Sequence, residues 1–313
     1  MVKWIQKSEE GSISDYGTYP GSRTDEELLK KGMIILDKPS GPTSHQVDAW
    51  IKEITGVTKA SHGGTLDPRV TGVMAIALQD STKLMPILLS SKKEYIALVN
   101  LHKEMPIDDI KKVCNEFIGK IKQLPPIKSA VARRVRERQI YYLEILEIDG
   151  RNILMKVGCE AGTYIRRLAD DIGKKLGIGA HLQELRRTKS GQFTEKDLVT
   201  LQDVIDAFQE NKIRDVVHPL ELIGDAISSV VVKDTAVDAI CNGAPVMLSG
   251  IIKFTDDIKK EAIVGIFTMR GEMVGFGKAK MDSETMVNNR RGSCIKTDKV
   301  IMKKGTYPKM WKR

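Results

Sequence analysis

Apolar residues in the first sixty positions form one short continuous run and then one helical stripe. The run from Gly32 to Leu36 predicts a buried strand, and residues 39–42 predict a turn that follows it. A helix is expected next, because Thr43 and Gln46 have capping-box spacing and Gly56 lies where a helix ends. Its core-facing stripe comprises Val47, either Trp50 or Ile51, and Ile54.

The middle of the chain mixes strand-like and helix-like patterns. Strands are expected at residues 72–78 and 93–101, and a hairpin at 139–160 that turns at Asp149-Gly150, a strong turn dipeptide. A further helix follows Gly162, and its apolar stripe comprises Ile165, Leu168, Ile172 and Leu176. Strands and helices mixed in this order predict an α+β fold.

The pattern changes near residue 224, after the helix-breaking pair His218-Pro219. Short strands with one helix then predict a small β-barrel-like module over residues 225–313. Residues 1–31 are irregular, and the aromatic stretch at 16–20 is expected to dock on another part of the chain. The sequence therefore predicts an N-terminal extension (1–31), a central domain (32–224) and a C-terminal module (225–313).

Composition narrows the class of protein. The chain has 313 residues, 41% of them hydrophobic, so it can bury a real core. Its net charge of +9 favours a polyanionic partner such as RNA. The four cysteines lie far apart with no zinc-finger spacing, so neither a metal site nor a disulfide framework is expected. No apolar run is long enough to span a membrane and no signal peptide is recognisable, which favours an intracellular, cytoplasmic protein.

Asp67 is the candidate catalytic group. It follows the glycines of the segment 61–66 and precedes Pro68, which restricts Asp67 to an extended conformation. A carboxylate on a rigid loop results, although Asp-Pro is also an ordinary start of a turn. Arg166 is the candidate partner, because a cation at a helix N-terminus opposes the helix dipole and a nearby carboxylate would explain it.

Five motifs resemble those of one enzyme family. Residues 61–73 resemble the GGxLDPxxxG signature of the TruB branch of RNA pseudouridine synthases, residues 38–44 its KPxGxTS motif, and residues 162–168 its GTYIRSL motif. This resemblance implies that Asp67 is catalytic and that Arg166 pairs with it. It also implies a catalytic core with a mixed, largely antiparallel sheet, no metal and no cofactor.

The same resemblance implies further site residues. Tyr95 matches the active-site Tyr of a K-x-Y motif, and Leu185 would line the uridine pocket within an LRRxxxG element. For both residues a packing role remains the alternative. The substrate-binding set implied is Lys38, Pro39, His62, Leu185, Arg186 and Arg187, of which the two arginines would face phosphates. Lys38-Pro39 could equally be surface turn chemistry.

The C-terminal module resembles a PUA domain, an RNA-binding fold, beginning at residues 236–244. Guide-RNA contacts are then expected from Asn242, Gly243, Ala244 and Lys253. Residues 37–45, 62–68 and 306–311 are most similar to the dyskerin type of the family in its archaeal form, the catalytic subunit of box H/ACA guide RNA particles.

Membership of this type implies partners: an H/ACA guide RNA, a target rRNA or tRNA, a small zinc-binding-type nucleolar protein, a Gly/Arg-rich protein and a kink-turn-binding ribosomal-type protein. Two other functions stay open at this stage. One is a stand-alone synthase acting on the tRNA elbow, and the other is a non-catalytic RNA-binding scaffold for ribosome assembly. The sequence names neither the uridines modified nor the atom that the Asp would attack.

Overall fold

The computed structural model describes residues 2–9, 15–125 and 134–309, so Met310 and Trp311 of the terminal motif lie outside it. The chain divides into two compact units. One comprises residues 34–76 and 85–212, and is called the catalytic unit below; the other comprises 1–33, 77–84 and 213–313, and is called the PUA unit. In this division residues 15–33 and 213–224 belong to the same unit as the C-terminal module, and the predicted domain boundaries stay a prediction.

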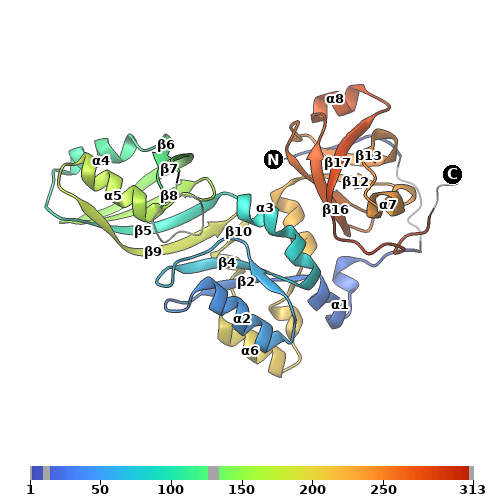
Figure 1. Cartoon of the computed structure of the whole chain (residues 1–313), viewed down its shortest axis with the longest axis horizontal. Coiled ribbons are helices and arrows are strands. Elements are labelled where there is room, and N and C mark those ends of the chain that lie inside the picture. Colours follow the sequence, from blue (N-terminus) through green and yellow to red (C-terminus); the bar gives the residue numbers. More distant parts are fainter. Residues whose placement is uncertain (1, 10–14, 126–133, 310–313) are drawn as a thin grey trace. The chain divides into compact units, whose positions relative to one another are not determined.

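A twisted sheet forms the centre of the catalytic unit, with the order β4-β9-β5-β8-β7-β6 (Figure 1). Its pairs are antiparallel except β4 with β9, which confirms the mixed, largely antiparallel sheet. The strands are β2 (Gly32–Lys38), β3 (Ala60–His62), β4 (Thr71–Leu78), β5 (Lys93–Leu101), β6 (Gly119–Gln123), β7 (Arg136–Asp149), β8 (Asn152–Cys159), β9 (Ala180–Ser190) and β10 (Phe193–Thr194).

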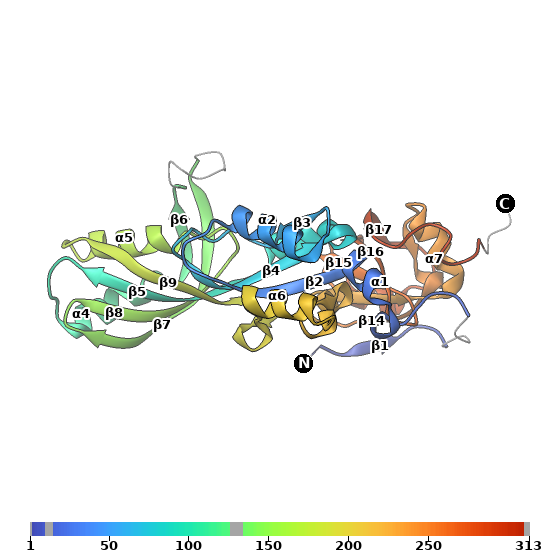
Figure 2. The same cartoon turned by 90° about the horizontal axis from the view of Figure 1, so that it is seen from below.

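Five α-helices accompany this sheet in the described residues: α2 (Ser44–Thr55), α3 (Met85–Ser90), α4 (Ile107–Asn115), α5 (Ile165–Lys175) and α6 (Leu201–Gln209). The predicted helix start is confirmed, since Thr43 and Gln46 form a capping box and Gly56 ends α2 with φ +71°. The hairpin is also confirmed, turning between Asp149 and Asn152. Figure 2 shows α2 and α5 in the same unit from below.

Strand β5 and helix α5 build the core that supports the site. Residues of β5 alternate between buried and half-buried, with Lys93, Tyr95 and Ala97 on the buried face. The apolar side of α5, including Ile165 and Leu168, joins the same cluster of buried side chains. This packing fixes the positions of β5 and α5, and with them the polar residues Lys93 and Tyr95 of β5 and Arg166 of α5.

The PUA unit contains a seven-stranded sheet in the order β1-β14-β12-β15-β16-β17-β13. Its elements are β1 (Trp4–Gln6), α1 (Asp25–Lys30), β11 (His218–Pro219), β12 (Ser228–Val232), α7 (Asp234–Cys241), β13 (Val246–Met247), β14 (Ile251–Thr255), β15 (Ile263–Phe267), β16 (Met273–Ala279), α8 (Ser283–Asn288) and β17 (Ser293–Val300). Short 3-10 turns connect several of these elements. The strands and helix α7 match the sequence-based expectation, whereas α8 is a second helix that the sequence analysis did not predict.

The N-terminal segment lies on this unit. Strand β1 pairs antiparallel with β14, and the Lys7 ammonium donates to three carbonyl oxygens at the end of α8. In the aromatic stretch, the rings of Tyr16 and Tyr307 are 6.4 Å apart and the Arg270 guanidinium lies 4.8 Å from the ring of Tyr19. These contacts involve the residues from which docking was expected.

All four cysteines are buried with free thiols. Among the described residues, none of the helices combines the length and apolarity that a membrane crossing requires.

Candidate active site

Asp67 and Arg166 meet at the surface of the catalytic unit. Asp67 lies in the loop between β3 and β4, hereafter the catalytic loop (residues 63–70), and Arg166 is the second residue of α5. The Arg166 guanidinium donates from Nη2 to Asp67 Oδ2. Their side chains are 61% and 55% exposed, so the ion pair adds little to stability. The pair explains the cation at the helix start and leaves a fixed carboxylate open to a substrate.

Lys38 binds the backbone of the catalytic loop from its buried side. Its side chain is fully buried, and Nζ donates to the carbonyl oxygens of Pro39 (2.8 Å), Pro68 (3.0 Å) and Val70 (3.0 Å). Burial lowers the pKa of Lys38, while nearby Asp67 opposes the shift. The three donors of the Lys38 ammonium thus bind the backbone, and its expected contact with substrate stays a prediction. Pro39, which follows it, is exposed.

The first turn of α2 braces the same loop. The Ser44 hydroxyl donates to the Leu66 carbonyl (3.0 Å) and accepts from the Leu66 N–H (2.9 Å). The Gly41 N–H donates to the Pro68 carbonyl at 2.9 Å. The backbone on both sides of Asp67 is therefore held by hydrogen bonds from the segment 38–44.

Arg187 is buried beneath the start of the catalytic loop, with 1% exposure. Its Nε donates to the Val73 carbonyl (2.7 Å) and its Nη2 to the Gly64 carbonyl (3.0 Å). Burial lowers the pKa of Arg187, and its hydrogen bond with Tyr95 opposes the shift. The guanidinium of Arg187 therefore lies inside the unit, bound to backbone carbonyls, and its expected contact with phosphates stays a prediction.

Arg186 has a different environment, although it adjoins Arg187. Its guanidinium binds both oxygens of Asp37 at 2.9 Å and one oxygen of Glu195 at 2.6 Å. These acids raise its pKa, Asp37 most of all. Two ion pairs already engage this cation, so an RNA phosphate would have to compete with them.

Tyr95 and Leu185 lie on neighbouring strands of the sheet. Tyr95 is 8% exposed and faces Arg187 across the β5–β9 pair. Burial raises the pKa of Tyr95, and the Arg187 charge opposes the shift. Leu185 is half-buried on β9, opposite Ala97, and packs on the core cluster. The structure thus places both residues at the core edge of the site, where a packing contribution is evident.

The sequence analysis missed three polar residues of this region: Ser44, Asp48 and Lys93. Ser44 and Asp48 belong to the buried stripe of α2, together with Val47 and Ile51. Polar residues at core-facing positions of a helix usually have a specific hydrogen-bond partner. The positions of Ser44 and Asp48 on this stripe could therefore have identified them from the sequence. Asp48 binds His62, a residue in the predicted substrate-binding set that is itself 7% exposed.

Lys93 is a buried cation next to Arg187. Its Nζ donates to the carbonyls of Leu88 and Ser91 and to the Ser91 hydroxyl, at 2.6 to 3.0 Å. Burial lowers the pKa of Lys93 from 10.5 to about 7, and the Arg187 charge acts in the same direction. Both cations lie close to Gly64 of the catalytic loop.

We expect the stability of the protein to depend on pH through Lys93. Between pH of about 7 and 10.5 the unfolded chain holds a proton on this amine that the folded chain has released, so the free energy of unfolding rises with pH in this window. Lys93→Met should remove this rise, which urea unfolding of both proteins at pH 7 and pH 9 would measure. If the free energy of unfolding changed equally with pH in both proteins, the three hydrogen bonds would be keeping the Lys93 amine charged in the folded state.

The residues expected to contact guide RNA lie at two places in the PUA unit. Asn242 and Gly243 are exposed at the end of α7, where Gly243 has φ +91° and open space around its Cα, and Ala244 follows. Lys253 lies on β14, and its Nζ is 5.6 Å from the centre of the Trp4 ring. The helix end therefore offers an accessible backbone loop, whereas Lys253 has an aromatic neighbour.

Four family descriptions match successive parts of the chain. The N-terminal domain of TruB family pseudouridylate synthases matches residues 52–165, and the C-terminal domain of tRNA pseudouridylate synthase B matches residues 166–223. A PUA domain matches residues 228–301, and a DKCLD (NUC011) domain matches residues 2–48. The predicted PUA module is thereby confirmed.

The chain is similar over almost its whole length to curated and solved proteins. It is 49% identical to the probable tRNA pseudouridine synthase B of Methanopyrus kandleri, over 98% of this chain and 93% of that protein. The corresponding protein of Methanosarcina barkeri is 48% identical with the same coverage.

Among solved structures, a chain in the crystal structure of a Cbf5-Nop10-Gar1 complex has a TM-score of 0.93 at 44% identity, covering 98% of this chain and 96% of that chain. A chain in the structure of an H/ACA RNP bound to a substrate RNA containing 2'-deoxyuridine has a TM-score of 0.92 at 42% identity, covering 99% and 98%. Given this identity, coverage and site geometry, the chain belongs to the TruB family of pseudouridylate synthases.

Proposed function

We propose that this protein is the catalytic subunit of an H/ACA guide RNA particle that isomerises uridine to pseudouridine in rRNA, and also in tRNA. One observation supports this most strongly: its fold matches, along nearly the whole chain, subunits of a Cbf5-Nop10-Gar1 complex and of an H/ACA RNP with substrate RNA. By analogy, its partners would be a guide RNA, Nop10-like and Gar1-like proteins, and a kink-turn-binding protein. It would work in the cytoplasm.

The reaction breaks the glycosidic carbon–nitrogen bond of uridine, turns the base and joins carbon 5 to the same sugar carbon. Carbon 5 loses a proton and the former glycosidic nitrogen takes one up, so no cofactor has to supply atoms. We propose that Asp67 acts on the base or the sugar as nucleophile or base, held in one position by Arg166. The target nucleotide must leave its helix or loop to reach this exposed pair. Tyr95 and Leu185 would then border the flipped base.

A second function is supported by the names of the curated relatives, which are probable tRNA pseudouridine synthases B. The protein would then act on tRNA without a guide. To separate the two, the purified chain would be assayed alone on tRNA, and with guide RNA and partner proteins on a complementary target. Modification that requires the matching guide supports the first proposal, and equal tRNA modification without a guide contradicts it.

The loop after α7 offers a test of guide-RNA binding. Gly243→Asp would place a carboxylate in open space at the proposed RNA-binding surface, and we expect guide-RNA affinity to fall on the order of 10-fold through repulsion of phosphates. Gly271→Asp is a matched control, because Gly271 also has positive φ (+82°) and open space in the same unit. Filter binding would measure the guide-RNA affinity of both variants, and thermal unfolding would show that both are folded. Equal affinities of the two variants would indicate that guide RNA binds another surface.

A further inference from the structure

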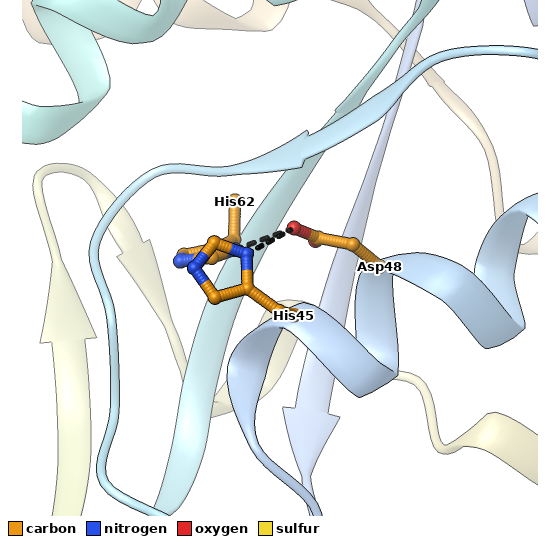
Figure 3. A group of neighbouring side chains, drawn as sticks. All are labelled: His45, Asp48 and His62. Carbon is orange, nitrogen blue, oxygen red and sulfur yellow. Dashed lines mark hydrogen bonds and ion pairs between the residues drawn. The ribbon is translucent and has the colours of Figure 1, made fainter.

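We propose that Asp48 is a positioning residue of the synthase, and that it acts on the catalytic loop through His62. Asp48 lies on the core-facing stripe of α2 and is 7% exposed, and His62 is the last residue of β3. Asp48 Oδ2 is 2.7 Å from His62 Nδ1 (Figure 3). On the other side of the ring, His62 Nε2 is 3.1 Å from the Thr65 hydroxyl. Thr65 precedes Asp67 by two residues.

The chemistry of the three groups sets the direction of the hydrogen bonds. An ionised carboxylate only accepts, so Nδ1 of His62 must hold the proton that is shared with Asp48. In the neutral imidazole, Nε2 then has a free lone pair and accepts from the Thr65 hydroxyl. Asp48 thus selects the tautomer that holds Thr65 in one orientation.

The backbone between His62 and Thr65 has high intrinsic flexibility. It consists of Gly63 and Gly64, and Gly64 has φ +137°, so this stretch has more backbone freedom than any other residue type would allow. Arg187 binds the Gly64 carbonyl and Ser44 binds the Leu66 backbone; the hydrogen bond from His62 adds the Thr65 side chain to these contacts, two residues before Asp67. A misplacement of about 1 Å at a reacting group can reduce the rate on the order of 100-fold.

The second carboxylate oxygen supports a role in function rather than in stability. Asp48 Oδ1 is buried and has no hydrogen-bond partner among the described residues. A buried, half-satisfied carboxylate costs free energy, and an apolar residue on the stripe of α2 would avoid this cost. The position therefore retains a group that destabilises the fold but orients the loop.

His45 completes a group of three possible metal ligands, but the geometry favours the hydrogen bond. His45 Nδ1 is 4.0 Å from Asp48 Oδ2, and its side chain is 84% exposed. Ligand atoms around a tetrahedral zinc are roughly 3.3 Å apart, given bonds of about 2.0 to 2.1 Å. The 2.7 Å contact between Asp48 and His62 is shorter and fits a shared proton.

The tautomer can be observed directly. In protein labelled with 15N-histidine, NMR signals of the ring nitrogens should show that the proton of His62 is on Nδ1. Asp48→Asn should change the balance between the two tautomers of His62, because an amide can donate as well as accept a hydrogen bond. The chain has five histidines, so single replacements would assign the signals. This measurement is independent of the proposed function. A proton on Nε2 in the wild-type protein would contradict the proposal, as would joint shifts of His45 and His62 with micromolar zinc, which would indicate a metal site.

Kinetics test the consequence, and this part rests on the proposed function. In the full chain with the RNA substrate it uses, Asp48→Asn and Asp48→Ala should lower the single-turnover rate by about 10- to 100-fold while RNA affinity stays within about 2-fold. Asp48→Glu should restore part of the rate. Glu53→Gln, which changes an exposed carboxylate of the same helix, should have no effect.

Two kinetic results would overturn the proposal: an unchanged rate in Asp48→Asn, or a loss of RNA affinity without a loss of rate. If Asp48→Ala fails to fold, the nearly isosteric Asp48→Asn still decides through its rate and its NMR signals. An inactive wild-type protein would instead count against the proposed function, since the tautomer would remain observable.

Discussion

Asp67→Asn should abolish pseudouridine formation, with a single-turnover rate reduced by more than about 10³-fold. The amide has almost the shape of the carboxylate and can still accept from Arg166, so the loop should keep its position. It cannot, however, act as nucleophile or base. RNA affinity should stay close to wild type, because the change removes one negative charge and no contact that holds the loop. Rates and affinities measured on the same RNA would show this.

Asp170→Asn provides the control for this result. Asp170 is also a surface carboxylate paired with an arginine, Arg167, at 2.8 Å, and it lies on the same helix as Arg166. Its loss should leave the rate within about 2-fold, because exposed ion pairs contribute little. Near-normal turnover in Asp67→Asn would contradict the proposed mechanism, whereas equal losses in both variants would indicate a general effect of charge.

The parts of the fold that sequence could predict depend on local chemistry. The capping box of Thr43 and Gln46 fixed the start of α2, and Asp149-Gly150 fixed the hairpin, because both signals act within four residues. The Asp67–Arg166 pair was also predictable, although it joins residues 99 positions apart. A cation at a helix start has an electrostatic cost that calls for a partner, and this is a local signal of a distant contact.

The parts that sequence could not predict depend on which face of an element is buried. The family resemblance implied that Lys38 and Arg187 contact the substrate. Both bind backbone carbonyls beneath the catalytic loop. Nothing local distinguishes a buried cation of this kind from an exposed one. Asp48 was missed for the related reason that its partner, His62, is brought to it only by the packing of α2 against β3.

Arg186 and Arg187 show how adjacent, identical residues come to differ. They follow each other on β9, and successive side chains of a strand point to opposite faces. One guanidinium therefore binds Asp37 and Glu195 near the surface, and the other enters the interior below the loop. Had residues 180–190 been predicted as a strand, the two arginines would have been assigned different roles.

Arg187→Met should destabilise the protein by about 3 kcal/mol and also slow catalysis. Methionine fills most of the space, but the Gly64 and Val73 carbonyls lose their charged donor, and each such bond contributes about 1.5 to 3 kcal/mol. Part of this loss is offset, because the buried charge is removed as well. Urea unfolding would measure the stability, and the single-turnover rate would report the position of the catalytic loop.

Arg186→Met is the matched control, since it makes the same change one residue away. Its ion pairs with Asp37 and Glu195 lie partly in solvent and should contribute only about 1 kcal/mol. Equal destabilisation by the two substitutions would show that the buried guanidinium does not support the loop. The reverse order, with Arg187→Met the milder variant, would mean that removing the desolvated charge outweighs the two lost hydrogen bonds. A large loss in Arg187→Met alone, together with a slower reaction, would show that the loop holding Asp67 depends on the buried cation of Arg187.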